Sequence, residues 1–590
     1  MPPILARSLV SLVVAAGLGA AFVAGTSYSG SGGADPGQVH TGHGGDDSGS
    51  DVSPAAFAGS GLSLPGSCDE LLTWYVDRGL DQVGPYGWDG YGYPYVVNDA
   101  VPAPMTSAAS GEQAYRSPLA AAPVRSTNEE TGTNVQEAGV DEPDVVKTDG
   151  RTLYRVQDGD LVGYDVSGAR VERLTSLDLP GASGADSTEL LLSGDTVVVL
   201  SQHQRQGTTE LATVDVSDPA APVITHTVEY DSGLVTARLQ DGVVRVVLEA
   251  GLPDLDFTHP DRNTTEYEAT QANREAVRLS TIEDWLPDAA VDGGAPEPLL
   301  ACDAVAIPDD ATALGTVAVV GFDAAAPDAP SVSGLAADTD LVYASADQLY
   351  LATTPSFGAV LRGCFDCIKP LPLPQRNPGP LPGPAGFSDG TTHLYAFALD
   401  GIDATFTASG EVDGVIRDRW SMDAVDGDSG PELRVVVGPS QNTGNFSSLV
   451  TFRQEGNDLV ESGRLDDLGV GEEVESVRWF DTLAIVVTFR QVDPLYAVDL
   501  TVAGQPRLMG TLKIPGYSAY LHPLGRHRLL GLGQAQGSGG MWGAQAGLFD
   551  VTDLTHPRQL SVVKYGPGTQ ALATSDPRQL TWLPDGRTVL

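Results

Sequence analysis

Three carboxylates fall within four consecutive positions where the sequence turns from irregular to strand-forming: Asp141, Glu142 and Asp144. Ca²⁺ takes roughly six to eight oxygen ligands from carboxylates and carbonyls, so this cluster is a candidate Ca²⁺ or other metal site. A calcium loop, however, alternates its acidic ligands with other residues, and this turn does not. The favoured interpretation is therefore a structural turn whose carboxylates cap backbone N–H groups.

A second group of candidate side chains lies in the stretch Tyr-Ser-Ala-Tyr-Leu-His-Pro near the C-terminus. We expect a loop in which Tyr517, Tyr520 and His522 line a surface for a glycan or a peptide, because aromatic rings with polar tips suit such contacts. Packing between repeated units is the alternative. Arg490 and Asp493 are candidates for a ligand site in a central channel, although a buried Arg–Asp pair that fixes one strand is favoured.

The sequence carries none of the common catalytic signatures. It contains no glycine-rich phosphate loop, no G-x-S-x-G turn and no H-E-x-x-H motif. Its nine histidines are scattered, so no catalytic triad can be argued. We therefore assign no catalytic residue and no cofactor. An enzyme is the alternative, most plausibly a metal-dependent hydrolase or lyase that uses carboxylates in a channel.

The four cysteines can form disulfides in more than one pairing. Cys364 and Cys367 form a C-x-x-C in a proline-rich stretch, which predicts a local disulfide. Cys68 and Cys302 are then left as a long-range pair by elimination. Zinc is the alternative at the C-x-x-C, but only His393 is near in sequence. A thioredoxin-like role would need a βαβ context, which is missing.

The charge balance excludes two classes of partner. The chain has 33 basic and 78 acidic residues, a formal net charge of −45. Such a surface repels phosphate backbones and anionic membranes. We therefore expect no nucleic-acid partner, no membrane contact beyond an N-terminal anchor, and a soluble monomer.

The N-terminal residues 1–25 have the composition of an export signal. Arg7 precedes an uninterrupted run of apolar and small residues from Leu9 to Ala24. The run is shorter than the roughly 20 residues that a membrane-spanning helix needs, so a signal peptide is favoured over an uncleaved anchor. Export predicts a secreted or cell-surface location, where disulfides persist.

The region before the strands divides into a spacer, a helix and a connector. Residues 26–66, rich in Gly, Ser and Asp, predict a disordered spacer. Ser67-Cys-Asp-Glu70 has a capping-box pattern and begins a predicted helix over 68–83. An irregular connector is expected to continue to residue 132. The apolar residues that share one face of this helix are Leu72, Tyr75, Val76, Leu80 and Val83.

From residue 133 to the C-terminus, short apolar strands alternate with turn signals. Several strands, such as Leu483–Phe489, are apolar at successive positions, which indicates burial on both faces. Most neighbouring strands have no helix between them, which excludes a parallel βαβ sheet. Antiparallel sheets that are buried on both faces and repeated along the chain predict an all-β fold, a β-propeller.

A recurring phrase sets the length of the repeated unit. It reads Asp-Val-Ser-Asp from Asp215, Asp-Val-Thr-Asp from Asp550 and Asp-Leu-Thr-Val from Asp499, and each copy separates two strands. Its Asp and Ser or Thr side chains are expected to cap the turn. The spacings from Asp165 to Asp215 and from Asp499 to Asp550 give a unit of about 50 residues. Seven to eight four-stranded blades therefore fit residues 133–590.

Two insertions interrupt this pattern. Residues 251–300 are expected to leave the third blade and to contain a helical stretch over 273–286. Its Leu279, Ile282 and Leu286 would share one face. Residues 355–390 form the second insertion, which is proline-rich and contains the C-x-x-C.

Two long phrases are specific: Val-Asp-Glu-Pro-Asp from Val140 and Phe-Arg-Gln-Val-Asp-Pro-Leu-Tyr from Phe489. With them the sequence resembles a known family, the secreted bacterial and archaeal proteins with a β-propeller domain distantly related to WD-40 repeats. The resemblance runs from about residue 67 to 580 and implies export and a propeller, with no established activity. The family usually continues with further strands, whereas this sequence stops at Leu590 inside the last expected blade.

These observations favour a binding or scaffolding module outside the cytoplasm, with a cell-surface protein or a polysaccharide as partner. A rigid repeated fold without a catalytic phrase is the basis for this expectation. Fold alone does not decide the matter, because propellers serve both as enzymes and as binding modules.

Overall fold

The computed structural model describes residues 62–88, 133–308, 314–339, 341–353, 390–427, 430–440, 443–489, 492–525, 527–536, 541–580, 582–583 and 588–589. Several predictions lie outside these residues. They are the signal or anchor over 1–25, most of the spacer, the connector beyond residue 88, Arg490, and the insertion 355–390 with Cys364 and Cys367. Among the described helices, none is both long and apolar enough to span a bilayer.

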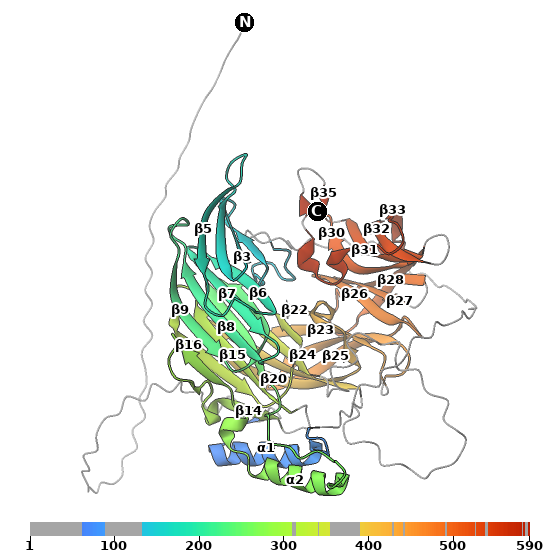
Figure 1. The fold of residues 1–590 in the computed structure, drawn as a ribbon. Helices are drawn as coiled ribbons and strands as arrows, with labels where there is room; N and C mark the ends of the chain where they lie inside the picture. The colour runs from blue at the N-terminus through green and yellow to red at the C-terminus, as the bar shows by residue number, and fades with distance from the viewer. Residues whose placement is uncertain are drawn as a thin grey trace, which may run out of the picture. The chain divides into compact units, whose positions relative to one another are not determined.

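Successive antiparallel groups of four strands make up most of the described chain (Figure 1). The first group is β2–β5 (Val146–Thr148, Thr152–Gln157, Asp160–Asp165, Glu172–Asp178) and the second is β6–β9 (Ser187–Ser193, Thr196–His203, Thr208–Asp215, Val223–Tyr230). The third is β10, β11, β15 and β16 (Gly233–Gln240, Val243–Ala250, Thr316–Asp323, Ala326–Leu335) and the fourth is β17–β20 (Leu341–Ala344, Gln348–Thr353, Thr391–Asp400, Asp403–Asp413).

The pattern continues to the C-terminal end. The fifth group is β22–β25 (Met422–Gly427, Gly430–Gly438, Ser447–Glu455, Asp458–Leu468) and the sixth is β26–β29 (Glu473–Phe480, Leu483–Phe489, Val492–Asp499, Arg507–Pro515). The seventh is β30–β33 (Tyr517–Pro523, Arg528–Gln536, Trp542–Asp550, Arg558–Lys564), and a separate pair, β34 and β35 (Trp582–Leu583, Thr588–Val589), follows. This succession is the one expected of propeller blades. The number of blades in a closed ring stays a prediction.

The repeated Asp phrase caps the turn after the third strand of a group. The carboxylate of Asp215, at the end of β8, accepts a hydrogen bond from the Ser217 backbone N–H at 2.8 Å. Asp550, at the end of β32, does the same for the N–H of Thr552 at 3.0 Å. The expected capping role of this phrase is therefore confirmed, and the carboxylate satisfies a donor that the sheet leaves unpaired.

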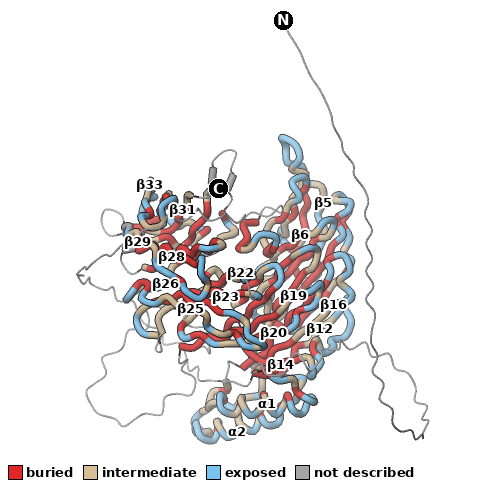
Figure 2. Tube along the Cα trace, turned by 180° about the vertical axis from the view of Figure 1, so that it is seen from behind, coloured by how far each residue is buried: buried red, intermediate tan, exposed pale blue. Residues whose placement is uncertain are grey.

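Neighbouring groups pack face to face, which explains why their strands are apolar on both sides. Val319 of β15 belongs to the same buried cluster as Leu351 of β18 and Phe397 of β19, which lie in the next group. Figure 2 shows this burial as continuous buried stretches along the strands. Each sheet therefore needs its neighbours to bury its faces.

Helix α1 (Cys68–Gln82) begins as predicted, but it buries a different face. The Ser67 hydroxyl accepts the N–H of Glu70 at 3.2 Å, whereas the Glu70 carboxylate accepts the N–H of Gly66 rather than that of Ser67. Of the expected apolar face, only Tyr75 and Val83 are buried, whereas Leu72, Val76 and Leu80 are half-buried. The residues that the helix itself buries are Leu71, Tyr75 and Gly79.

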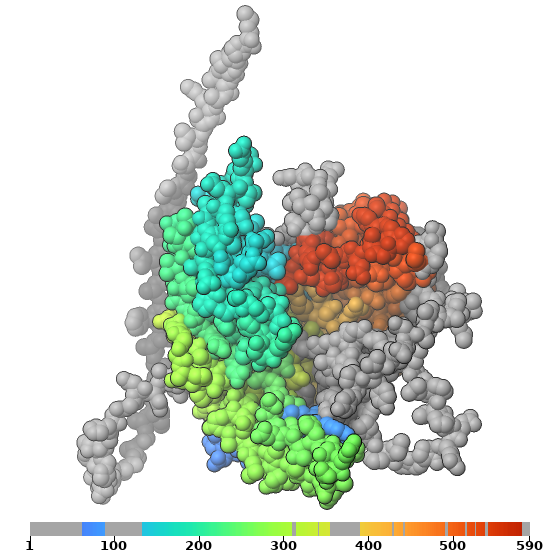
Figure 3. Space-filling view, in the orientation of Figure 1, coloured from blue at the N-terminus to red at the C-terminus, as the bar shows by residue number. Residues whose placement is uncertain are grey.

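The physical reason is a tryptophan from the insertion. The ring of Tyr75 stacks on that of Trp285 with centroids 4.8 Å apart. A Cβ on Gly79 would meet Trp285 at 3.2 Å and Val277 at 3.1 Å. Because the insertion packs against this side of α1, the buried face of the helix consists of Leu71, Tyr75 and Gly79. Figure 3 shows the insertion residues packed over α1.

The insertion leaves the third group after β11, and its helix begins and ends earlier than the predicted 273–286. Helix α2 spans Glu266–Arg278, and a 3₁₀ turn follows at Ile282–Asp284. Leu279 is 72% exposed because the helix has ended, so the expected Leu279–Ile282–Leu286 face does not form. Thr265 and Glu268 form a full capping box at the start of α2.

The end of the insertion and the residues that follow it contact the second group, the third group and α1. Strands β12 (Asp288–Val291) and β13 (Glu297–Pro298) extend the second group beyond β9, and β14 (Val305–Pro308) pairs with β16 and with β1 (Leu62–Ser63). A disulfide joins Cys68 of α1 to Cys302, with the two Cα atoms 5.2 Å apart. The predicted long-range pair is thereby confirmed.

Candidate functional site

The segment 133–144, which we call the axial segment, runs across the first strands of several groups. Asp141 exchanges backbone hydrogen bonds with Leu239 of β10, at 2.8 and 3.0 Å. Asp144 exchanges them with Leu190 of β6, at 3.0 and 2.7 Å. The segment therefore pairs with the first strands of the second and third groups.

Side chains of the axial segment reach three more first strands. Glu137 accepts a hydrogen bond from the Tyr343 hydroxyl of β17 at 2.9 Å. Gln136 donates to the carbonyl of Met422 in β22 at 3.1 Å, and Asn134 donates to the Tyr520 hydroxyl of β30 at 2.7 Å. First strands that are far apart in the chain thus converge on one short segment. This convergence is what innermost blade strands do around a propeller axis.

The three candidate metal ligands in this segment point to different partners. Asp141 pairs with the Lys147 ammonium at 2.7 Å. Glu142 binds the Arg419 guanidinium through both oxygens, one of them at 2.6 Å. Asp144 accepts the N–H of Val145 at 2.7 Å. Across the described residues no group of three His, Cys, Asp or Glu side chains lies close enough to hold a metal ion, so the acidic turn does not assemble a ligand set.

The electrostatics of Glu142 follow from this arrangement. Burial alone would raise the pKa of its carboxyl, but the charges of Arg419 and Arg238 and the hydrogen bonds from Arg419 and Gln136 lower it to about 2. Burial lowers the pKa of the Arg238 guanidinium to about 10, against the attraction of Glu142. The axial segment therefore carries a fixed anion between two cations.

A third arginine, Arg578, also contacts the axial segment, and it lies much later in the chain. Arg578 donates to Glu189 of β6 at 2.6 Å and to the carbonyl of Pro143 at 2.5 Å. It also pairs with Asp576 at 2.9 Å. Sequence reasoning missed Arg238, Arg419 and Arg578. The one available signal was Arg238, an isolated arginine in an otherwise apolar strand.

The stretch Tyr-Ser-Ala-Tyr-Leu-His-Pro is strand β30, not the expected loop. Tyr520 and His522 are 4% and 1% exposed, so they lie in the interior and present no surface. Burial lowers the pKa of His522 to about 4, and the charge of Arg478 adds to this effect. Only Tyr517, at the start of the strand, is half-buried. The side chain of Asp493 lies outside the described part of the chain, as Arg490 does.

Tyr517 belongs instead to a group of three aromatic rings, which we call the aromatic surface. Its ring centroid lies 4.5 Å from that of Phe489 and 6.1 Å from that of Trp542. The rings of Phe489 and Trp542 are 5.8 Å apart and nearly perpendicular. Trp542 is 36% exposed, and Met541 beside it is 59% exposed. Strands β27, β30 and β32, from two neighbouring groups, hold these rings in place.

An ion pair borders the aromatic surface. Arg417 binds Glu475 at 3.0 Å. Burial raises the pKa of Glu475 against the attraction of Arg417, and both charges act on the Tyr517 hydroxyl. The site thus combines flat apolar faces with hydrogen-bond donors and acceptors. Sequence reasoning found Tyr517 alone, because Phe489 and Trp542 lie far from it in the chain.

Comparison with known proteins gives a family match and partial sequence similarity to two archaeal proteins. A family model described as a β-propeller domain matches residues 130–590. An uncharacterised protein of Archaeoglobus fulgidus is 32% identical over 168 residues, which is 28% of this chain and 24% of that protein. An uncharacterised protein of Methanocaldococcus jannaschii is 31% identical over 179 residues, 29% of this chain and 27% of that protein. The match thus spans about a quarter of each curated relative.

Among solved structures, dihydro-heme d1 dehydrogenase NirN in complex with DHE is similar with a TM-score of 0.35 and 11% identity. The similarity covers 71% of this chain and 65% of that one. The family match, together with the succession of four-stranded groups, confirms the predicted propeller fold.

Proposed function

Because this chain belongs to the β-propeller domain family, we propose that it is an extracytoplasmic binding module whose partner is a neutral polysaccharide. The observation that carries the proposal is the aromatic surface of Phe489, Tyr517 and Trp542. The disulfide between Cys68 and Cys302 supports an oxidising location, in agreement with the export signal expected over 1–25.

The chemistry of the aromatic surface suits sugar rings. The C–H face of a pyranose is apolar, and its hydroxyls are polar, so it matches an aromatic ring bordered by donors and acceptors. The Arg417–Glu475 pair supplies both kinds of hydrogen-bonding group. The rings stand on paired strands of two packed groups, which limits the entropy lost on binding.

Charge narrows the class of polysaccharide. The formal net charge of −45 repels polyanionic chains such as those rich in uronic acid or sulfate. A neutral polymer meets no such barrier. The alternative enzyme hypothesis, a metal-dependent hydrolase or lyase, gains no support from the acidic turn, because protein partners engage each of its three carboxylates.

The test is affinity electrophoresis of the full chain through gels that contain single neutral polysaccharides, namely xylan, β-glucan, mannan and starch. We expect at least one polymer to retard the protein. Trp542→Ala is expected to weaken that binding by roughly thirtyfold, the effect of losing a central aromatic anchor worth about 2 kcal/mol. Tyr267→Ala is the matched control, since Tyr267 is 73% exposed on α2.

Two outcomes would count against the proposal. Migration that none of the four polymers retards would remove the polysaccharide as partner. Equal retardation of Trp542→Ala and the unmodified chain would place binding on another surface. If the true partner is a cell-surface protein, the chain would bind that protein even after all polysaccharide has been removed from the sample.

A further inference from the structure

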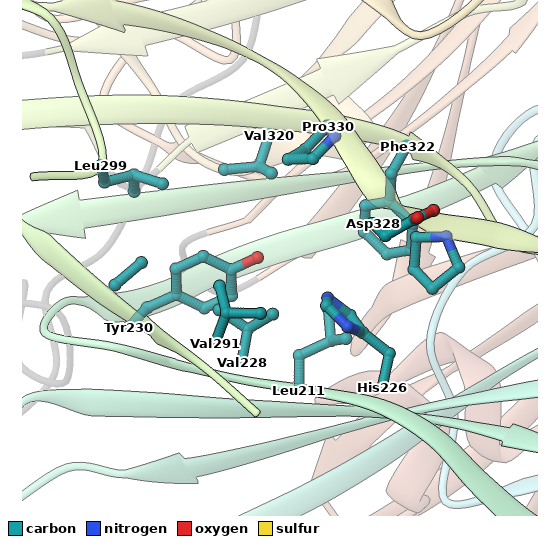
Figure 4. A pocket seen from close by; sticks show the side chains of 12 residues that line it. Leu211, His226, Val228, Tyr230, Val291, Leu299, Val320, Phe322, Asp328 and Pro330 are labelled. Carbon is teal, nitrogen blue, oxygen red and sulfur yellow. The ribbon is translucent and has the colours of Figure 1, made fainter. Parts of the chain in front are cut away.

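A cavity of about 90 Å³ lies between the second and third groups, on elements that do not form the aromatic surface. Strands β8, β9 and β12 line one side, and β15 and β16 line the other (Figure 4). Its floor is buried: Leu211 and Phe322 are each 2% exposed. Its mouth is open, because Val291 is 48% exposed and Asp328 is also exposed.

The alternation of strand residues explains the lining. On β9, His226, Val228 and Tyr230 stand on one face at a spacing of two, and all three line the cavity. Val320 and Phe322 do the same on β15. A gap remains between the lining faces of β9 and β15, because Ala289 and the prolines of β16 are short and fill little of the space between them.

Tyr230 brings a hydroxyl into this apolar space. Figure 4 shows the Tyr230 oxygen directed toward the space between the lining side chains. The residue is 4% exposed, its hydroxyl shows no hydrogen bond among the described residues, and the oxygen itself is not fully enclosed. Burial raises the pKa of this phenol, so it stays protonated and is a donor. A buried tyrosine hydroxyl ordinarily has a partner, and here the cavity is the place for one.

His226 supplies a second polar group. Its Nδ1 lies 3.4 Å from a carboxylate oxygen of Asp292, and the residue is 8% exposed. A carboxylate at Nδ1 holds the proton on that nitrogen in the neutral ring, which leaves Nε2 as an acceptor. The cavity therefore presents the Tyr230 hydroxyl and the His226 imidazole among apolar walls.

We propose that this cavity binds a small neutral molecule of the phenol class, one ring bearing one hydroxyl. The apolar walls contact part of the ring, while the ligand hydroxyl accepts from Tyr230 and donates to His226. A volume of about 90 Å³ is below the roughly 150 Å³ of an engineered cavity that holds benzene, so the ring projects into the open mouth. Asp292 and Asp328 near the mouth repel anions, which excludes carboxylates and phosphates.

Isothermal titration of the full chain with phenol and with benzene tests the proposal. We expect saturable one-to-one binding of phenol and roughly thirtyfold weaker binding of benzene, the effect of losing two neutral hydrogen bonds. Tyr230→Phe removes one of the two hydrogen bonds, so it is expected to weaken phenol binding roughly fivefold and to leave the benzene affinity unchanged. A purely structural role of Tyr230 would weaken both ligands alike.

Two obstructing variants locate the site. Ala289→Leu fills the cavity from β12 and is expected to abolish binding of both ligands. Val291→Phe narrows the exposed mouth and should do the same without disturbing the core. Circular dichroism confirms that each variant is folded. Lack of saturable phenol binding by the unmodified chain would mean that the cavity holds water only and would overturn the proposal. Phenol binding that survives both obstructing variants would overturn it as well.

Discussion

Glu142 and Arg419 are 277 positions apart in the chain and form an ion pair through both carboxylate oxygens. Glu142 belongs to the axial segment, and Arg419 lies in the 3₁₀ turn Arg419–Ser421 that precedes the fifth group. The Glu142 side chain is 4% exposed and that of Arg419 is 22% exposed. The pair therefore fixes the axial segment to a group of strands that the chain reaches only much later.

Breaking this pair is expected to destabilise the protein strongly. Glu142→Gln leaves the Arg419 guanidinium without its carboxylate, which costs about 3 to 5 kcal/mol for a buried pair. Urea unfolding of the full chain measures the change in free energy. The control is Glu455→Gln, which breaks the exposed pair with Arg453 and should cost no more than about 1 kcal/mol. Equal effects of the two variants would contradict the assigned role of Glu142.

The pH dependence of stability is expected to report His522. Its pKa is lowered from 6.5 to about 4 in the folded state, so the unfolded chain binds the extra proton first as pH falls. Stability is therefore full above pH 6.5 and is lost progressively down to about pH 4, by about 3 kcal/mol for this shift. Urea midpoints at several pH values measure the slope. His522→Asn should flatten it, whereas His556→Asn, at an exposed position, should not.

A second, more acidic loss of stability is expected from Glu142. Its folded pKa of about 2 lies below the ordinary value of 4.5, so the stability it contributes is present above pH 4.5 and is lost as pH falls toward 2. The same urea series, extended below pH 4, measures this acidic loss of stability. Glu142→Gln should remove the loss below pH 4.5 and leave the loss due to His522 in place. An acidic loss that persists in Glu142→Gln must come from other carboxylates.

Removing the Cys68–Cys302 disulfide is expected to cost about 2 to 5 kcal/mol, because the bond closes a loop of 234 residues and anchors α1. Thermal melting of Cys68→Ser against the unmodified chain measures this loss. Digestion without reductant, followed by mass spectrometry, checks the pairing. It also tests the local disulfide that the sequence predicts between Cys364 and Cys367. A peptide linking Cys68 to Cys364 would refute both pairings.

Features set by neighbours in the sequence could be predicted. Ser67 marks the start of α1, and the apolar run Leu483–Phe489 indicates a strand buried on both faces. The Asp215 phrase predicts its own capped turn, because the groups involved are two residues apart. These inferences need only local geometry, and the structure agrees with them.

Features set by distant partners could not be predicted. Nothing near Glu142 in the sequence indicates that Arg419 neutralises it, so the sequence predicts a structural turn with a metal site as a candidate, but not this ion pair. Tyr520 and His522 have the composition of a binding loop, but Tyr520 is hydrogen-bonded by the axial segment and packs against Trp420, which is distant in the sequence. The extent of α2 was misjudged for a related reason: Leu279 continues the apolar pattern although the helix has already ended.

The axial segment has a consequence for the order of events during synthesis. Asn134 hydrogen-bonds to Tyr520 and to the carbonyl of Pro577, which are 386 and 443 positions further along the chain. Ribosomes add roughly 5 to 20 residues per second, so Asn134 waits on the order of tens of seconds for these partners to exist. The centre of the molecule therefore cannot be completed before Pro577 has been synthesised.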